Sequence, residues 1–126
     1  MNAPERIAAA ISPASVHEAR QRAAVSGRGL YQELEAGCQL GTREFVQAIG
    51  RLFGMGVVET AEMFAWKPAF DLLPLPRALQ RDCALFVGEN GKVFGVVPDP
   101  FDTALHDWIE AQAGSQIELF LALRAR

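Results

Sequence analysis

The sequence predicts an α+β fold in which a helical N-terminal subdomain, residues 1–54, precedes a small α/β sandwich, residues 55–126. Apolar residues in the first half recur at helical spacing, which is typical of amphipathic helices. In the second half, short apolar segments lie between turns that contain glycine and proline, which favours strands. The order strand, helix, strand near the C-terminus predicts a right-handed parallel crossover. Together with a hairpin, this crossover should give a mixed sheet of three to four strands.

The first two helices are expected before residue 27. A short alanine-rich helix is predicted at residues 4–11. The stretch Ser15-Val-His-Glu18 is predicted to be a capping box, because a serine three residues before a glutamate lets each side chain bond the other's backbone. The helix that this box opens should end near Val25, before Ser26 and Gly27.

A third helix is expected at residues 30–37, and Thr42 is the expected N-cap of a fourth helix that Gly54 closes. In this fourth helix, apolar residues follow Phe45 at one, four, seven and eight positions along the chain, which places them on one side of the helix. The predicted buried face consists of Phe45, Val46, Ile49, Leu52 and Phe53.

The second half should contain the sheet. Residues 60–76 are expected to be mostly loop with one helical turn, and Pro76 should open a short helix to about Asp82. Asn90-Gly91 predicts a tight hairpin turn, because these residues accept the positive φ such a turn needs. Strands are predicted at residues 57–58, 85–88, 92–97 and 116–123.

The segment PDPFD, which ends at Asp102, is predicted to start the last helix, which Gly114 stops. Asp99 would be the N-cap, Pro100 the first helical residue and Asp102 the third, since both charges suit the positive end of a helix. The expected buried face is Phe101, Leu105, Trp108 and Ile109, and the expected solvent face is Thr103, His106, Asp107 and Glu110. A metal site built from Asp99, Asp102, His106 and Asp107 is the disfavoured alternative.

Composition restricts the class of function. Half of the 126 residues are hydrophobic and the net charge is −3, which fits one domain and argues against nucleic acid or an anionic membrane surface as a partner. We see no secretory signal peptide and no membrane span, so the expected location is cytoplasmic, without direct membrane insertion. Cys38 and Cys83 are expected to be reduced core thiols.

No constellation in the sequence predicts catalysis. It has no Walker A motif and no nucleophile elbow, so we expect a domain that is not an enzyme and holds no metal or cofactor. The stretch Ser26-Gly-Arg-Gly-Leu30 could present amides and a guanidinium to a phosphate, but a simple turn between helices is the favoured interpretation.

Two stretches, residues 18–59 and 75–102, together resemble a known family. The first has a helix, a small-residue turn, Leu-x-x-x-Leu and a second helix. The second has a short helix, a hairpin and the Asp-Pro-Phe-Asp element, and a helix and a strand follow it. This order resembles the N-terminal domain of type II secretion assembly ATPases. Related domains occur in type IV pilus ATPases and attached to some bacterial glycosyltransferases.

The resemblance implies a docking and regulatory domain. Its expected partners are the cytoplasmic domain of an inner-membrane secretion platform protein and the remainder of a parent ATPase or glycosyltransferase. The chain would then lie at the inner membrane through its partner. From residue type and expected exposure, we predict that the partner-binding residues lie on the helical half, at Arg20, Arg22, Arg28, Tyr31 and Arg43.

The resemblance also implies an alternative, because some members of the family bind cyclic di-GMP. The matching ligand-binding positions here are Arg28, Leu30 and Leu34. Tyr31 stands where the motif has a glycine, and a second glycine position falls on Cys38. Since a glycine lets the backbone approach a ligand closely, these two side chains disfavour the usual binding mode. A regulatory appendage of a glycosyltransferase is the third interpretation.

Overall fold

The computed structural model describes residues 11–38, 40–63 and 65–123, and it has the α+β class that the sequence predicts. The predicted helix at residues 4–11 lies almost wholly outside the described residues. The elements, in chain order, are α2 (Pro13–Ser26), α3 (Leu30–Gly37), α4 (Thr42–Phe53), β1 (Gly56–Glu59), α5 (Thr60–Met63), β2 (Lys67–Pro68), α6 (Leu75–Arg81), β3 (Ala84–Val87), β4 (Val93–Val97), α7 (Thr103–Ala113) and β5 (Glu118–Leu123). None of the described helices is long and apolar enough to cross a membrane.

The strands form one mixed sheet in the order β1-β5-β4-β3-β2. As predicted, β3 and β4 make an antiparallel hairpin, in which Gly91 has φ +77°, and α7 connects the parallel neighbours β4 and β5. The sheet exceeds the predicted three to four strands, because β2 forms at Lys67–Pro68 within the segment expected to be loop. Two residues give no periodic signal that could have revealed this strand.

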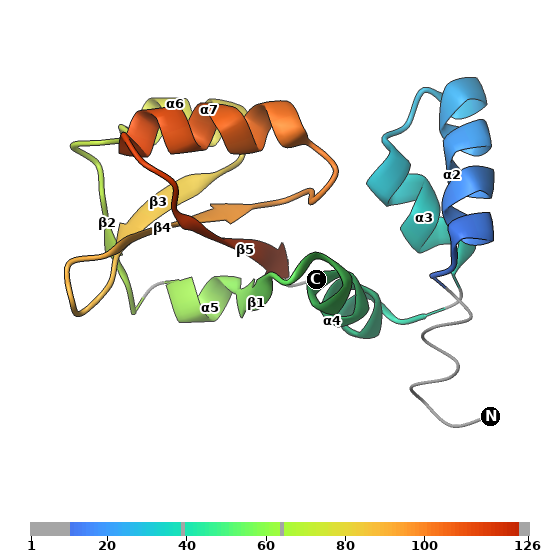
Figure 1. Cartoon of the computed structure of the whole chain (residues 1–126), viewed down its shortest axis with the longest axis horizontal. Coiled ribbons are helices and arrows are strands. Elements are labelled where there is room, and N and C mark those ends of the chain that lie inside the picture. The colour runs from blue at the N-terminus through green and yellow to red at the C-terminus, as the bar shows by residue number, and fades with distance from the viewer. Residues whose placement is uncertain (1–10, 39, 64, 124–126) are drawn as a thin grey trace.

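The helices lie on both sides of the sheet and beyond its end. Helices α6 and α7 cover one face, α5 lies on the opposite face, and the α2–α3 pair stands at the far end of the molecule (Figure 1). Helix α4 lies between the α2–α3 pair and the sheet, and it contacts β1 and β5. The division into subdomains 1–54 and 55–126 stays a prediction.

The starts of two helices differ from the sequence prediction. The N-cap of α2 is Ser12, and Ser15 is its third helical residue, so the predicted Ser15–Glu18 capping box is wrong. The Ser12 N–H donates to Ser15 Oγ at 2.7 Å, and the Ser15 N–H donates to Ser12 Oγ at 3.2 Å. Pro13 fits the first helical position, where no N–H is needed, so the helix can begin there. Helix α4 has Gly41 as its N-cap, one residue before the predicted Thr42.

The buried face of α4 is also shifted from the prediction. Phe45, Val46 and Ile49 are buried, as expected. In contrast, Leu52 is 63% exposed and Phe53 is 44% exposed. The chain turns back after α4, and the Met55 N–H donates to the Gly50 carbonyl at 2.8 Å. This backbone segment covers the last turn of the helix at Gly50, so residues 52 and 53 are left on the outer side.

One hydrophobic core extends from the helices to the sheet. The largest fully buried side chains include Leu34, Phe45 and Ile49 from the helical half and Ile109 and Leu121 from the sheet half. Both cysteines are buried free thiols, in agreement with the predicted core positions. The same core therefore joins α3 and α4 to the sheet and α7.

Candidate interaction surfaces

The carboxylate of Glu33 in α3 is the centre of a polar cluster. The residue is only 5% exposed. Arg22 in α2 reaches it with Nε at 3.3 Å from Oε2 and also donates from Nη2 to the Glu33 carbonyl at 3.0 Å. Arg28 lies with Nη1 at 3.4 Å from Oε1, to which the Ser26 hydroxyl donates at 3.2 Å. Two predicted partner-binding arginines therefore hold the α2–α3 pair together.

The other predicted partner-binding residues lie elsewhere. Arg20 is exposed on α2, and Arg43 on α4 pairs with Glu59 at the end of β1. Tyr31 is directed into the molecule. The structure thus brings Arg22 and Arg28 together around Glu33 and leaves Arg43 at a separate place. A partner surface that includes these five residues remains a prediction.

Tyr31 fills the joint between α3, α4 and the start of α7. Its ring centroid lies 5.2 Å from that of Phe45 and 6.2 Å from that of Phe101. Its hydroxyl is buried and makes no hydrogen bond within the described residues. Burial raises the pKa of this phenol well above its usual value, and the nearby carboxylates of Glu35 and Asp99 raise it further.

We expect Tyr31 to stay protonated until the protein unfolds in alkali. The native state keeps the proton above pH 10 whereas the unfolded chain loses it, so the free energy of unfolding should fall as the pH rises beyond about 10. Because the chain has one tyrosine, the increase in absorbance at 295 nm that accompanies tyrosine ionisation comes from this residue alone. The same titration in concentrated urea should show a midpoint near 10. A reversible midpoint near 10 with native circular dichroism would contradict the expectation.

The PDPFD segment starts α7, but three residues later than predicted. Asp102 is the N-cap, and its carboxylate accepts from the Leu105 N–H at 3.1 Å, so the predicted N-cap at Asp99 is wrong. Asp99 instead accepts from the Phe101 N–H at 2.8 Å and closes the turn before the helix. Burial raises the pKa of Asp99, and the Phe101 hydrogen bond partly offsets this effect.

The expected solvent face of α7 includes two residues that are not free in solvent. Glu110 is half-buried, and its carboxylate accepts from the Ile117 N–H at 3.3 Å. His106 is half-buried, and its Nε2 lies 3.0 Å from the Asp99 carbonyl oxygen. Leu105 and Ile109 are buried as predicted. Trp108 is half-buried, and the Arg81 guanidinium carbon lies 4.6 Å from the centroid of the Trp108 ring. Asp99, Asp102 and His106 thus have structural partners. Within the described residues, no group of three or more His, Cys, Asp or Glu side chains is placed to bind a metal.

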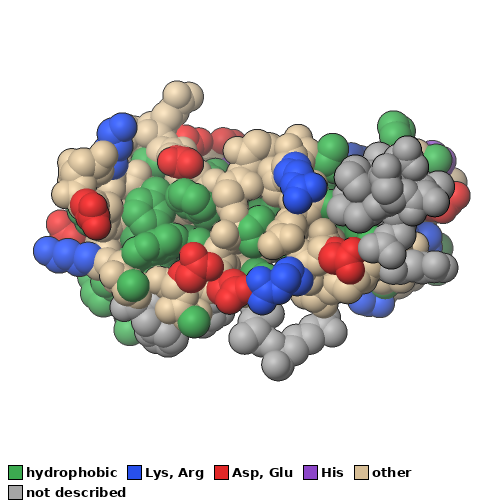
Figure 2. Space-filling model, turned by 90° about the horizontal axis from the view of Figure 1, so that it is seen from below, with side chains coloured by type: hydrophobic (Ala, Val, Ile, Leu, Met, Phe, Trp, Pro, Cys, Tyr) green, Lys and Arg blue, Asp and Glu red, His purple; other side chains and the backbone are tan. Residues whose placement is uncertain are grey.

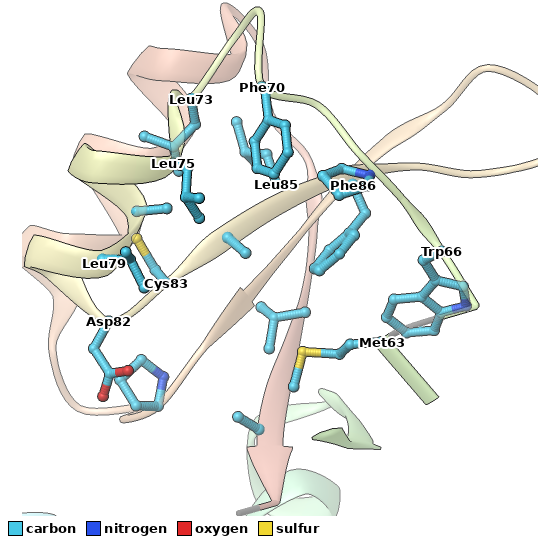
Figure 3. Close-up of a pocket in the computed structure, with 16 residues that line it drawn as sticks. Met63, Trp66, Phe70, Leu73, Leu75, Leu79, Asp82, Cys83, Leu85 and Phe86 are labelled. Atoms are coloured by element: carbon cyan, nitrogen blue, oxygen red, sulfur yellow. The ribbon is translucent and has the colours of Figure 1, made fainter. Parts of the chain in front are cut away.

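An apolar groove lies beside α6, in the half of the molecule that contains the sheet. Its volume is about 570 Å³, and Leu75 and Leu79 of α6 lie on one side of it, with Met63 and Trp66 on the other (Figure 3). Viewed from below, apolar side chains gather in a hollowed patch on this half (Figure 2). Three rim residues are unusually exposed for their type, namely Phe70 at 50%, Leu75 at 49% and Leu79 at 72%.

The groove has few polar groups. Among the residues that line the groove, Asp82 is the charged one. Its neighbour in the sequence, Cys83, also lines the groove. Burial raises the pKa of the Cys83 thiol to about 11, while Arg81 lowers it slightly, so the thiol is neutral at physiological pH. Sequence reasoning missed this groove. Its residues come from positions 63 to 122, and exposed leucines at positions 75 and 79 were the one signal available.

Comparisons with known proteins identify related folds. A protein-family model described as the MshEN domain matches residues 53–126, which is more than half of the chain. The structure of MshE with cdg is similar at 17% identity and a TM-score of 0.66, covering 90% of this chain and 83% of that chain. The N-terminal domain of XpsE is similar at 20% identity and a TM-score of 0.55, covering 98% and 90% respectively. The search of curated proteins found no match.

Proposed function

Because this chain belongs to the MshEN domain family, we propose that it is a non-catalytic interaction domain that docks a secretion-type ATPase to an inner-membrane platform protein. The family resemblance of residues 18–59 and 75–102 and the fold shared with the XpsE N-terminal domain support this proposal. The domain would then act in the cytoplasm, held at the inner membrane through its partner. Its parent would be the ATPase, and a glycosyltransferase parent is the alternative.

The exposed apolar groove is the observation that carries the docking function. Exposed apolar patches with a polar rim mark interaction sites, because they are costly to leave in water. Phe70, Leu75 and Leu79 together form such a patch around a concave site. Arg20 and Arg28, which are exposed on the helical half, are proposed as peripheral contacts that steer the partner.

Cyclic di-GMP binding is a second candidate, because the similar MshE structure contains cdg, which we take to be this nucleotide. The matching positions in this chain are already engaged in the fold. Leu34 is 1% exposed, and the Arg28 guanidinium pairs with Glu33. The Tyr31 ring occupies the space beside Phe45. Binding would require Arg28 to leave Glu33, so we favour docking over nucleotide sensing.

Two titrations test the proposal. In the first, the chain is titrated with the cytoplasmic domain of the platform protein encoded beside its parent gene, and we expect micromolar or tighter binding. In the second, it is titrated with cyclic di-GMP, and we expect no heat at millimolar-range ligand. Cyclic di-GMP binding that is lost in Arg28→Ala, with no platform binding, would replace the docking function by the sensor. Absence of both would remove both candidates.

A further inference from the structure

We propose that the outer edge of β1 binds an extended segment of a protein partner, which pairs its backbone with Val57 and directs an acidic side chain toward Arg51. This surface lies where α4 meets the sheet, and it shares no described residue with the apolar groove beside α6 (Figure 1). The inference goes beyond the proposed docking function, because it applies to any protein that supplies such a segment.

The two edges of the sheet differ in their protection against further pairing. Strand β2 forms one edge and consists of Lys67 and Pro68, which are both exposed. Lysine and proline are residues that natural sheets carry on an edge to prevent the addition of another strand. Strand β1 forms the other edge and has neither, since its sequence is Gly-Val-Val-Glu with a charge only at the last residue. The edge of β1 is therefore the one that can accept another strand.

The unpaired backbone groups of this edge are those of Val57. The Met55 N–H donates to the Gly50 carbonyl at 2.8 Å, and the Glu59 N–H donates to the Glu62 carboxylate at 3.2 Å. Both donors thus point away from β5. Val57 lies midway between them and points the same way, because backbone groups alternate sides along a strand. Neither its N–H nor its carbonyl has a hydrogen bond to a described residue on this side, so Val57 offers one donor and one acceptor to an added segment.

A hollow beside Val57 leaves room for such a segment. Its volume is about 510 Å³, and it lies between the last two turns of α4 and the start of β1. Gly50, Gly54 and Gly56 are among the residues that line it, so few side chains cover the backbone there. The space at Gly54 is open, since a Cβ added to it would meet no atom of another described part of the chain within 4 Å. An extended segment can therefore approach the edge of β1 from this side.

The charge of the hollow defines one residue of the partner. Arg51 is the charged residue among the described residues that line it, and Gln47 lies one turn earlier on α4. Arg51 is exposed and makes no ion pair with a described residue, whereas Arg43 is already paired with Glu59 at the other end of β1. An aspartate or glutamate beside the pairing residue of the segment would complement the Arg51 guanidinium and fix the register on β1.

A second copy of this chain is a poorer occupant than a separate segment. The second copy would have to offer its own β1, which α5 follows directly at Thr60 and which α4 and Gly54 precede closely. Helices thus bound this strand of four residues at both ends, and they would lie against the same helices of the first copy. A segment with extended residues on both sides of its pairing residue does not have this restriction.

The test uses random 12-residue peptides displayed on phage and selected against the whole chain. Enriched sequences are made as labelled synthetic peptides, and their dissociation constants are measured by fluorescence anisotropy. Each peptide is also made with an N-methyl group at one residue at a time, which removes a backbone donor from the peptide and leaves the protein unchanged. Hydrogen exchange of the Val57 amide is followed by nuclear magnetic resonance in the free chain and in each complex.

In the free chain, the Val57 amide should exchange faster than that of Val58, which faces β5. One class of enriched peptides should carry aspartate or glutamate among β-branched residues and slow the exchange of Val57 about tenfold or more. N-methylation should weaken this class about three- to tenfold at the residue that pairs with Val57 and not at its two neighbours. Arg51→Gln should weaken it several-fold. Arg77→Gln is the matched control, exposed on α6 outside the hollow, and should change binding less than about twofold.

Four results would overturn the inference. These are no enriched peptide that slows the exchange of Val57, equal effects of N-methylation at adjacent residues, equal binding of acidic peptides to Arg51→Gln and the native chain, or slowed exchange of Val57 through dimerisation of the chain itself. If the platform domain binds the chain while any of these results is found, the docking function stands and the inference on β1 fails. If peptides pair with Val57 but the platform domain does not bind, the docking partner is wrong while the inference on β1 stands.

Discussion

Replacement of Phe45 by alanine is expected to lower the free energy of unfolding by about 3–5 kcal/mol. Phe45 is fully buried in α4 and packs against the Tyr31 ring of α3. Removing its ring would lose the apolar transfer energy and leave a cavity between the helical half and the sheet. Since domains of this size are stable by about 5–15 kcal/mol, this loss would be a large part of the total.

The control for this prediction lies eight residues later in the same helix. Phe53 is 44% exposed, and its ring meets Phe101 edge-on at 5.1 Å. Phe53→Ala should therefore cost only about 1 kcal/mol, since much of its ring is already in water. Urea denaturation of both variants, followed by circular dichroism, provides the comparison. Equal losses in the two variants would mean that Phe45 does not carry the packing between α4 and α3.

The sequence predicted elements whose signals are local and strong. Helix α3 begins at Leu30 and ends at Gly37, as predicted, and Gly54 and Gly114 close α4 and α7 with positive φ. The Asn90-Gly91 turn joined β3 and β4 as expected. In each case a few adjacent residues determine the conformation, through helical spacing or through a glycine that accepts a left-handed backbone.

The starts of helices were harder to predict because neighbouring residues compete for one role. Both Asp99 and Asp102 can accept a backbone N–H, and the structure uses both, one in a turn and one as the N-cap. Ser12 and Ser15 compete in the same way at α2. Which residue becomes the cap depends on how α7 or α2 packs, and this information is not local to the cap.

The candidate sites depend even more on distant residues. Residue type and expected exposure selected the arginines, yet the position of Arg22 is determined by Glu33, eleven residues later on another helix. An acidic residue in a short helix gives no sign that it will be buried. The groove beside α6 is assembled from α5, α6 and four strands, β2 to β5, and only the tertiary structure brings these segments together. The periodicity of each segment alone could not predict it.

Replacement of Arg22 by leucine is expected to cost about 2–3 kcal/mol of stability, more than a typical surface ion pair. Arg22 makes an ion pair with the Glu33 carboxylate at 3.3 Å and donates to its carbonyl at 3.0 Å. Its loss leaves a carboxylate that is largely removed from water, with Arg28 and Ser26 as its remaining partners among the described residues. A buried charge that loses its main partner is strongly destabilising, and the 43% exposure of the Arg22 side chain moderates the effect.

The Glu33→Gln substitution decides whether the loss comes from the buried charge. In the Arg22→Leu background it removes the uncompensated carboxylate, so the double variant should be more stable than Arg22→Leu alone. Arg20→Leu is the control, since Arg20 is exposed on the same helix, and it should change stability by less than about 0.5 kcal/mol. Thermal and urea denaturation of the native chain, Arg22→Leu, Glu33→Gln and the double variant would measure the coupling, with Arg20→Leu as a fifth protein for the control. If Glu33→Gln gave no recovery, the role of Arg22 would be packing of its side chain over Gly37, where any added methyl group would collide with its guanidinium.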